Sequence, residues 1–435
     1  MHTNSSDGHN PLVAALGPLP QDIKAFNRLI QRLPTPPTEQ ERDAPMPQRY
    51  EAVRSLEQQV YIPGARDLKM AMDLQTMIVA GYKTRQANAR YWQQHQQTCR
   101  ALPNLLSEVH GPTLIGDPMA LIGGSGSGKS TLINNMLSTI PQVHTHTADD
   151  PLLPRHQINW LKINCPVNGT PRSFLTAFFS EMDRLLGTKL VDKNKRINDD
   201  ERIVILGRLA RTYFLGVLVI DEIQHLVSAP KKDERRLLKL IVNLSATLGV
   251  PLLFVGTFKA QDMISRELAD ARRMLGPRWL PYAADDADWL RFLEKLWVYQ
   301  YTRVFTPLTP TLRSKVHDLS QGIPALAKKL FCLTQEFLIY NGNGINPENI
   351  TAEILQSVFD ENMAVVAPAI EALRSGRGID RINDLPSMAP IGDHAEWLLD
   401  EKRAHLVRNV HDTTLIQQTK RIARTKATMA CKALG

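Results

Sequence analysis

Cysteine is scarce in this sequence, and long apolar runs are missing. Only four cysteines occur among 435 residues, and no two of them form a Cys-x-x-Cys pair. This spacing favours neither a disulfide framework nor a zinc site and indicates a reducing compartment. No apolar run approaches the roughly 20 residues of a membrane span, and the N-terminus lacks a signal-peptide pattern. We therefore expect a cytoplasmic protein with no membrane segment.

Acidic residues are too few to balance the basic ones. The chain has 52 Lys and Arg against 44 Asp and Glu, which gives a formal net charge of +8. Such a balance favours an acidic partner such as nucleic acid, although a basic enzyme without that partner has the same composition. The length allows about two or three domains.

A glycine-rich loop is the strongest motif. A short apolar stretch, Met119 to Ile122, runs into this loop and then into a helix-compatible segment, which together match the P-loop pattern. Lys129 is expected to reach the β- and γ-phosphates of ATP, and the Ser130 hydroxyl to hold Mg²⁺. A flexible linker, the alternative, would hardly end in Lys-Ser between a strand and a helix. The predicted nucleotide-binding residues are Gly123, Gly124, Ser125, Gly126, Ser127, Gly128, Lys129, Ser130 and Thr131.

Two later strands carry the predicted catalytic groups. Residues 217–222 read V-L-V-I-D-E, which fits a buried parallel strand with two carboxylates at its carboxyl end. Asp221 is expected to act on Mg²⁺ through water, and Glu222 to polarise the attacking water. The next buried strand, residues 251–256, ends at Thr257, whose hydroxyl either senses the γ-phosphate or caps the strand. The sequence thus predicts ATP hydrolysis as well as binding.

Hydrophobic periodicity places further elements around these motifs. A short helix is expected at 21–33, helical structure over 54–100, and a loop at 141–155. His144, His146 and His156 lie in or beside this loop, and solvated side chains are favoured over a metal site. The other predicted strands cover 159–164 and 279–281, and the other predicted helices cover 172–186, 231–248, 288–301, 311–319, 323–340 and 351–358.

The order of these motifs resembles the AAA+ ATPase regulators of Tn-seven-like transposons, the TnsC/TniB group. The resemblance covers about Tyr61 to Phe359, and its most specific parts are D-E-I-Q-H at 221–225, Gly256-Thr257 and S-Q-G-I-P at 320–324. It implies an α/β AAA+ P-loop NTPase with a parallel five-stranded sheet and an α-helical lid. It also implies ATP-dependent rings or filaments of this chain on double-stranded DNA, which link a target-selection protein to transposase subunits.

AAA+ proteins bind ATP between neighbouring subunits, and the neighbour supplies an arginine. Arg272 and Arg273 are the candidates for this finger, with Arg266 third. Many AAA+ lids carry a Gly-x-x-Arg sensor, but here Ala325 stands in the arginine position, which leaves only Lys328 or Lys329 as substitutes. Residues 188–202 are expected to be a charged connection, either a solvated loop or a patch that contacts phosphates. The DNA-binding candidates are Arg172, Lys189, Lys193, Lys195 and Arg196.

These predictions divide the chain into five parts. They are a flexible Pro-rich arm (1–50), an N-terminal helical extension (51–115), the AAA+ nucleotide-binding domain (116–305), the helical lid (306–366) and a basic C-terminal tail (367–435). From Glu401 onward the tail has eight basic and two acidic residues. Three roles stay open for this tail: it binds DNA, it contacts transposase, or it only solubilises the chain.

Two other functions of the whole protein also stay open. One is another AAA+ DNA-remodelling or loader ATPase, and the other is a signalling P-loop switch that binds protein only.

Overall fold

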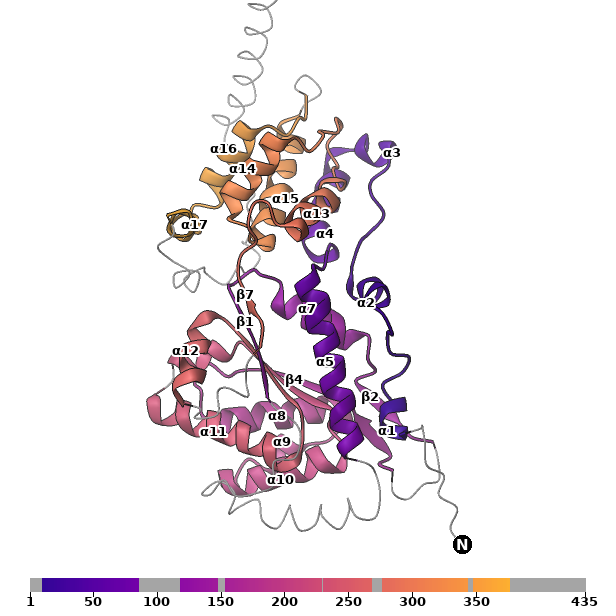
Figure 1. Cartoon of the computed structure of the whole chain (residues 1–435), viewed down its shortest axis with the longest axis vertical. Coiled ribbons are helices and arrows are strands. Elements are labelled where there is room, and N and C mark those ends of the chain that lie inside the picture. Colours follow the sequence, from indigo (N-terminus) through magenta and orange to yellow (C-terminus); the bar gives the residue numbers. More distant parts are fainter. Residues whose placement is uncertain are drawn as a thin grey trace, which may run out of the picture. The chain divides into compact units, whose positions relative to one another are not determined.

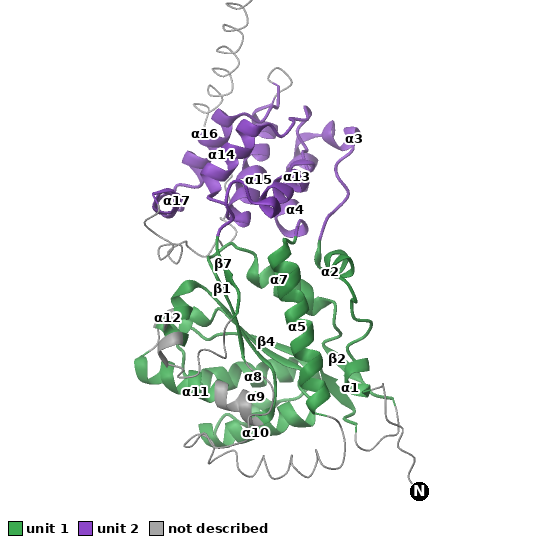
Figure 2. Ribbon diagram, viewed as in Figure 1, with its two compact units in different colours: residues 1–31, 63–280 green, residues 32–62, 281–435 purple. Residues whose placement is uncertain are grey.

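The fold is described from a computed structural model of the chain (Figure 1). The structure describes residues 10–85, 118–147, 153–228, 230–267, 276–342 and 347–375, without the side chains of 228, 242–247, 262 and 265–267. The chain forms two compact units, the first of residues 1–31 and 63–280 and the second of residues 32–62 and 281–435 (Figure 2). It therefore passes from one unit to the other three times.

A parallel five-stranded sheet forms the centre of the first unit. Its strand order is β4-β5-β6-β1-β7, and every neighbouring pair is parallel. All residues of β5 and β6 are buried, as expected for central strands that are covered on both faces. The predicted five-stranded parallel sheet is confirmed. The strands are β1 (Met119–Gly123), β4 (Trp160–Asn164), β5 (Val217–Asp221), β6 (Leu252–Gly256) and β7 (Arg278–Trp279).

Helices pack around this sheet. On α8, Thr170 is the N-cap, Pro171 is the first helical residue and Gly187 ends the helix at φ 64°. This helix packs against β4, α10 and α11, while α5 packs against α7 and the N-terminal helices. The helices of this part are α5 (Ala65–Thr84), α7 (Lys129–Ser138), α8 (Pro171–Leu186), α9 (Leu190–Lys193), α10 (Asp199–Thr212), α11 (Lys231–Leu248) and α12 (Phe258–Glu267), with the 3₁₀ helix η2 at Ile223–Ser228.

The structure adds a helix that the sequence analysis did not predict. Residues 199–212 form α10, although residues 188–202 were expected to be a charged connection. The Asn198 side chain accepts a hydrogen bond from the backbone N–H of Glu201 at 2.8 Å. Three acidic residues in the first turn also favour the helix, since they lie at the positive end of its dipole. The expected connection is therefore wrong from Asp199 onward.

A short hairpin replaces part of the expected histidine loop. Strand β2 (Val143–Thr145) pairs antiparallel with β3 (His156–Ile158). The rings of His144 and His146 lie 4.8 Å apart, and burial together with His146 lowers the pKa of His144. Within the described ranges, no cluster of three or more His, Cys, Asp or Glu residues could hold a metal ion.

The described part of the Pro-rich N-terminus is folded. Helices α1 (Pro11–Ala14) and α2 (Ile23–Ile30) bury Leu12, Phe26 and Ile30 in the first unit. Gln157 donates to the Leu12 carbonyl at 2.8 Å, and Asn135 of α7 donates to the Ile30 carbonyl at 3.2 Å. The helix predicted at 21–33 is thus present as α2 and packs on the first unit. Residues 10–31 are not the flexible arm that composition suggested, because partners more than 100 residues away in sequence fix them.

The second unit is helical. Its long helix α15 packs against α4, α14 and α16, and the ring of Trp297 on α13 lies 5.1 Å from that of Phe331. The C-terminal part of this unit begins at Pro281, whereas we expected the lid to begin at residue 306, and the unit also includes α4. The helices are α3 (Glu39–Arg42), α4 (Met46–Gln59), α13 (Ala287–Trp297), α14 (Pro310–Ser320), α15 (Pro324–Asn341), α16 (Ala352–Asn362) and α17 (Ala367–Arg374).

The S-Q-G-I-P segment forms the turn between α14 and α15. Gln321 and Gly322 have φ values of 47° and 69°. A Cβ atom on Gly322 would lie 1.9 Å from the carbonyl oxygen of Tyr282, so only glycine fits. Pro324 follows as the first residue of α15, a position where its missing N–H costs nothing. Backbone packing therefore accounts for this motif.

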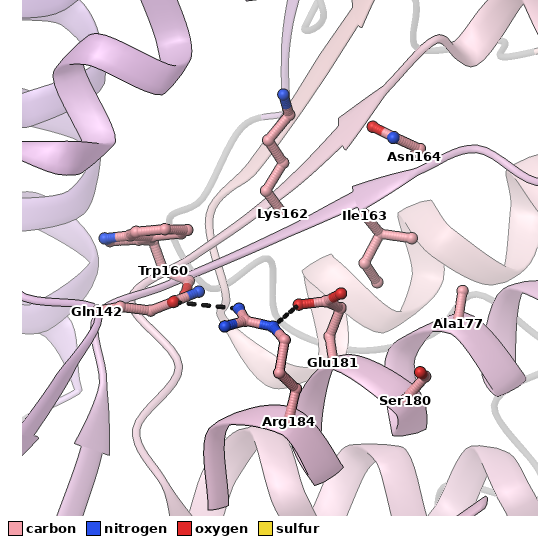
Figure 3. Close-up of a pocket in the computed structure, with 9 residues that line it drawn as sticks. All are labelled: Gln142, Trp160, Lys162, Ile163, Asn164, Ala177, Ser180, Glu181 and Arg184. Carbon is pink, nitrogen blue, oxygen red and sulfur yellow. Dashed lines mark hydrogen bonds and ion pairs between the residues drawn. The ribbon is translucent and has the colours of Figure 1, made fainter.

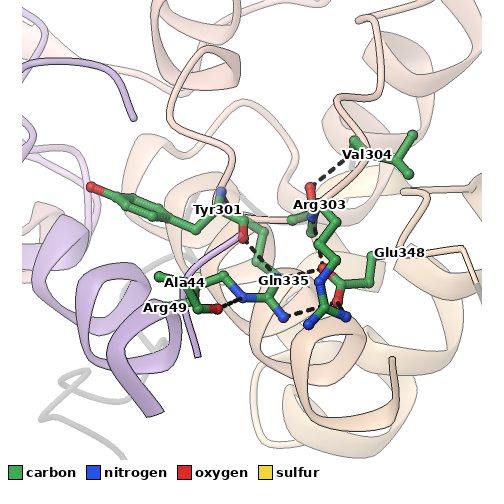
Figure 4. Close-up of polar contacts among 8 residues, drawn as sticks. Ala44, Arg49, Tyr301, Arg303, Val304, Gln335 and Glu348 are labelled. Carbon is green, nitrogen blue, oxygen red and sulfur yellow. Dashed lines mark hydrogen bonds and ion pairs between the residues drawn. The ribbon is translucent and has the colours of Figure 1, made fainter. Parts of the chain in front are cut away.

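A buried ion pair joins α4 to the C-terminal part of this unit (Figure 4). The side chains of Arg49 and Glu348 are 1% and 2% exposed, and Arg49 Nη1 lies 2.5 Å from Glu348 Oε2. Arg49 also donates to the carbonyls of Ala44 at 3.0 Å and Tyr301 at 3.1 Å. The backbone N–H of Arg303 donates to Glu348 at 2.8 Å. Both charges are thus compensated although they are shielded from water.

The two lysines considered as sensor substitutes also bind α4. Lys328 Nζ donates to the carbonyls of Glu57 at 2.6 Å and Val60 at 3.0 Å, and burial lowers its pKa. Lys329 Nζ lies 2.7 Å from the Glu57 carboxylate. Both ammonium groups therefore stabilise the C-terminal end of α4.

Across the described part of the chain, no helix has both the length and the apolar character needed to span a membrane.

Candidate nucleotide-binding site

The P-loop connects β1 to α7. Gly126 and Gly128 have φ values of 76° and 94°, in the left-handed region that side chains disfavour. A Cβ atom on Gly123 would lie 2.7 Å from the Cβ of Trp279 and 2.8 Å from its carbonyl oxygen. Three glycines of the motif are therefore required by the backbone itself. The loop leads into the N-terminus of α7, where unpaired N–H groups favour anions.

Lys129 bends back over this loop. Its ammonium group donates to the carbonyl oxygens of Gly123 and Gly124, both at 2.8 Å. Burial lowers the pKa of Lys129 to about 8, while the carboxylates of Asp221 and Glu222 act in the opposite direction. Arg66 of α5 adds to the lowering through its positive charge. The lysine is therefore held at the loop in an environment that disfavours its charge.

Ser130 at the start of α7 meets Asp221 at the end of β5. The Ser130 hydroxyl donates to Asp221 Oδ1 at 3.2 Å, and the aspartate is 3% exposed. A hydroxyl and a carboxylate at this separation are the oxygen ligands that Mg²⁺ prefers. The residues present therefore fit the predicted metal position.

Lys162 is a member of this site that the sequence analysis missed. Its Nζ lies 2.8 Å from Asp221 Oδ2 and donates to Asn134 Oδ1 at 2.8 Å. Lys162 lies on β4, which pairs with β5 so that Asn164 is opposite Asp221. A lysine at the centre of strand β4 was the available signal in the sequence, but the identity of its partner depends on how β4 aligns with β5.

A pocket of about 490 Å³ lies at the β4 edge of the sheet (Figure 3). Trp160, Lys162 and α8 residues line it. Arg184 lies 2.9 Å from Glu181 and donates to Gln142 at 3.2 Å. Figure 3 shows the Lys162 side chain directed away from these two charged residues. Because Arg184 and Glu181 pair with each other, the pocket does not indicate a charged ligand.

Glu222 and Thr257 follow β5 and β6, which are neighbours in the sheet. Glu222 has φ 56°, and its carboxylate accepts a hydrogen bond from Gln224. Gln224 in turn accepts from the backbone N–H of Thr257 at 3.1 Å. The Thr257 hydroxyl oxygen is inaccessible to solvent and has no hydrogen-bond partner among the residues that the structure describes. The Thr257 hydroxyl therefore forms no described hydrogen bond that would cap the strand.

The structure brings together most of the predicted site. Lys129, Ser130, Asp221, Glu222 and Thr257 all lie at the carboxyl ends of β1, β5 and β6, which is where open α/β sheets bind ligands. The arginine-finger candidates Arg272 and Arg273 lie outside the described residues, and the side chain of Arg266 is not described.

The predicted DNA contacts lie around the start of α8 and α9. Arg172 pairs with Asp199 at 3.2 Å and donates to the Lys195 carbonyl at 2.7 Å. The other four candidates, Lys189, Lys193, Lys195 and Arg196, are exposed. The stretch 189–201 also contains four acidic residues, so the surface has mixed charge.

Comparison with known proteins supports the predicted fold class. Residues 116–264 match the family model described as "AAA domain". Together with the P-loop and the order of the parallel strands, this match confirms an AAA+ P-loop fold for that part of the chain. A comparison with curated proteins found no match.

Several solved structures share parts of this arrangement at low similarity. Cdc6p from Pyrobaculum aerophilum is 16% identical with a TM-score of 0.38, and the match covers 63% of this chain and 67% of that one. The ORC1 protein of Aeropyrum pernix, solved in complex with DNA, is 17% identical with a TM-score of 0.37, over 73% and 82%. A Walker-type ATPase of Pyrococcus abyssi is 13% identical with a TM-score of 0.34, over 65% and 75%. These values carry no conclusion about function.

Proposed function

We propose that this chain, whose residues 116–264 match an AAA domain, binds and hydrolyses ATP with Mg²⁺. The observation that carries the proposal is the meeting of Lys129, Ser130, Asp221, Glu222 and Thr257 at one end of the sheet. Nucleotide binding alone would not require a second carboxylate beside the metal position. Glu222 supplies that second group.

The P-loop residues fit a triphosphate. Backbone N–H groups of residues 123–131 would contact the phosphate oxygens, and the Lys129 ammonium would turn from the loop carbonyls toward them. Ser130 and Asp221 would hold Mg²⁺, which neutralises charge on the phosphates. Lys162 already compensates the charge of Asp221, so it would share that carboxylate with the metal.

Glu222 and Thr257 would act on the water and on the terminal phosphate. The Glu222 carboxylate orients and polarises the attacking water, as a general base does. The Thr257 hydroxyl, buried with no partner among the described residues, would donate to the γ-phosphate or to that water. Either Arg272 or Arg273 of a neighbouring subunit would stabilise charge on the transferring group, so hydrolysis would depend on assembly.

At the next level, we propose that ATP drives assembly on double-stranded DNA and that the assembly links a target-selection protein to transposase subunits. The net charge of +8 supports contact with DNA phosphates. The motif resemblance at 221–225, 256–257 and 320–324 supports the role in transposition. Lys189, Lys193, Lys195 and Arg196 remain candidates for DNA contact, and the tail beyond residue 375 for contact with transposase.

ATP-dependent DNA binding tests this function. The protein is expected to bind duplex DNA in the presence of a non-hydrolysable ATP analogue, with an affinity that falls steeply between 50 and 200 mM salt, about 10-fold or more. Lys129→Ala should abolish this binding because it removes the ammonium at the P-loop. Filter binding or anisotropy over a salt series measures both effects. Lys69→Ala is the matched control, since that lysine side chain is 73% exposed and belongs to the same unit.

The outcomes separate the alternatives. No DNA binding would contradict the proposal and favour a P-loop switch that binds protein only. Nucleotide-independent DNA binding would contradict the proposed coupling of ATP to assembly on DNA. ATP-dependent DNA binding without capture of a transposase by the full-length protein would favour another DNA-remodelling or loader ATPase.

Nucleotide affinity is expected to depend on pH through Lys129. Because the pKa of this lysine is lowered to about 8, the free protein loses the proton between pH 7 and 9. Phosphate binding requires the charged form, so the ATP dissociation constant should rise about tenfold over that interval. Calorimetry at pH 7 and 9 measures the change and the proton taken up on binding. Lys129→Arg, which stays charged, should show no such dependence, and an equal dependence in both proteins would contradict the assignment.

A further inference from the structure

The chain bends sharply where the catalytic carboxylate leaves β5. Glu222 adopts φ 56°, a left-handed conformation that residues with a side chain disfavour. Its backbone N–H donates to Asp221 Oδ1 at 2.9 Å, and the next residue, Ile223, is fully buried. The surrounding structure therefore fixes the backbone of Glu222, but these contacts leave its side-chain torsions unrestrained.

Gln224 supplies the missing restraint. Its Nε2 donates to Glu222 Oε2, and its Oε1 accepts from the backbone N–H of Thr257 at 3.1 Å. The orientation of this amide follows from chemistry, because a backbone N–H can only donate and a carboxylate oxygen accepts. The side chain thus connects the end of β5 to the end of β6 with both ends of its amide engaged.

The end of β6 is shaped to receive this amide. A Cβ atom on Gly256 would lie 3.1 Å from Gln224 Oε1 and 2.5 Å from Ile223 Cγ2. A larger residue at 256 would collide with the Ile223 side chain and crowd the Gln224 amide oxygen. Glycine at this position leaves room for the Gln224 contact.

We propose that Gln224 is a positioning residue that orients Glu222 and couples it to the strand end that carries Thr257; this rests on the proposed ATP hydrolysis. A base that is itself oriented by a third group acts at a defined angle, and a misplacement of about 1 Å can cost 100-fold in rate. Gln224 would contact neither the nucleotide nor the attacking water. It acts through the carboxylate.

Gln224→Ala is expected to lower the kcat for ATP about 10- to 100-fold while the KM and the ATP dissociation constant stay within about twofold. Gln224→Glu should behave similarly, since it keeps the acceptor for Thr257 but places a second carboxylate against Glu222. This nearly isosteric variant covers the case in which the alanine variant does not fold. Steady-state ATPase kinetics and calorimetric ATP binding provide the readouts.

A double variant separates positioning from general damage. In a Glu222→Gln background, Gln224→Ala should change the residual rate by less than about twofold, because the group it positions is already gone. Three results would each overturn the inference. They are an unchanged kcat in Gln224→Ala, a loss of ATP binding in both Gln224→Ala and Gln224→Glu, and additive losses of rate in the double variant. If the unaltered protein does not hydrolyse ATP, the proposed function fails; if only Glu222→Gln is inactive, this inference alone fails.

Discussion

Glu222→Gln is expected to lower ATP turnover by about 10²- to 10⁴-fold and to leave ATP binding intact. Glutamine has the same size and still accepts a hydrogen bond, but it cannot take a proton from water. Lys129 and Ser130, the residues proposed to bind phosphate and Mg²⁺, are unchanged. Single-turnover ATPase assays and calorimetric titration of ATP measure the two quantities separately.

Slow turnover should also prolong ATP-dependent assemblies on DNA. Glu201→Gln is the matched control, because it removes the same charge from an exposed position of α10 in the same unit. That variant should retain normal turnover. Unchanged hydrolysis in Glu222→Gln would show that another group activates the water.

The second large effect is expected in the helical unit. Arg49→Ala should destabilise this unit by about 3–5 kcal/mol, because it leaves the Glu348 carboxylate buried without its main counter-charge. The midpoint of urea unfolding, followed by tryptophan fluorescence, should fall accordingly. Trp289 and Trp297 report on this unit.

A surface ion pair of the same unit provides the comparison. Glu371→Ala removes a carboxylate that is 66% exposed and pairs with Arg374 at 2.7 Å. Its effect should stay below about 1 kcal/mol. Equal midpoints for Arg49→Ala and Glu371→Ala would show that the buried pair does not hold the unit together.

The central strands could be predicted because their signal is local. Val217 to Ile220 and Leu252 to Val255 are consecutive apolar residues, and such runs need cover on both faces of a sheet. The P-loop was equally visible, since its glycines are set by the backbone around them. For α11, the predicted and observed ranges coincide at 231–248.

Other elements were not predicted from the sequence, for identifiable reasons. The strands of the β2–β3 hairpin are three residues long, too short for a clear alternation. In α10, Ile203, Leu206 and Ala210 are buried at helical spacing, but the charged residues before them resembled a loop. Helix α2 lies within the helix predicted at 21–33, whereas α1 was not predicted. The packing of both helices depends on partners far along the chain, and composition does not disclose these.

The candidate site shows the same division. Lys129, Ser130, Asp221 and Glu222 follow from short motifs, whereas the contacts of Lys162 and Gln224 depend on how neighbouring strands align. A shift of β4 against β5 by one residue would turn Lys162 to the other face of the sheet. A single sequence specifies that alignment only through the complete fold.

The placement of α4 has a consequence for synthesis of the protein. Arg49 precedes its partner Glu348 by 299 residues, and Lys328 follows its acceptor Glu57 by 271. During translation, residues 32–62 therefore emerge long before the helices that cover them, while residues 63–280 of the sheet-containing unit are made in between. Domains generally fold as their chains become available, so the nucleotide-binding unit can fold first. Arg49 can form its buried ion pair only after Glu348 has been synthesised. The helical unit is therefore completed last.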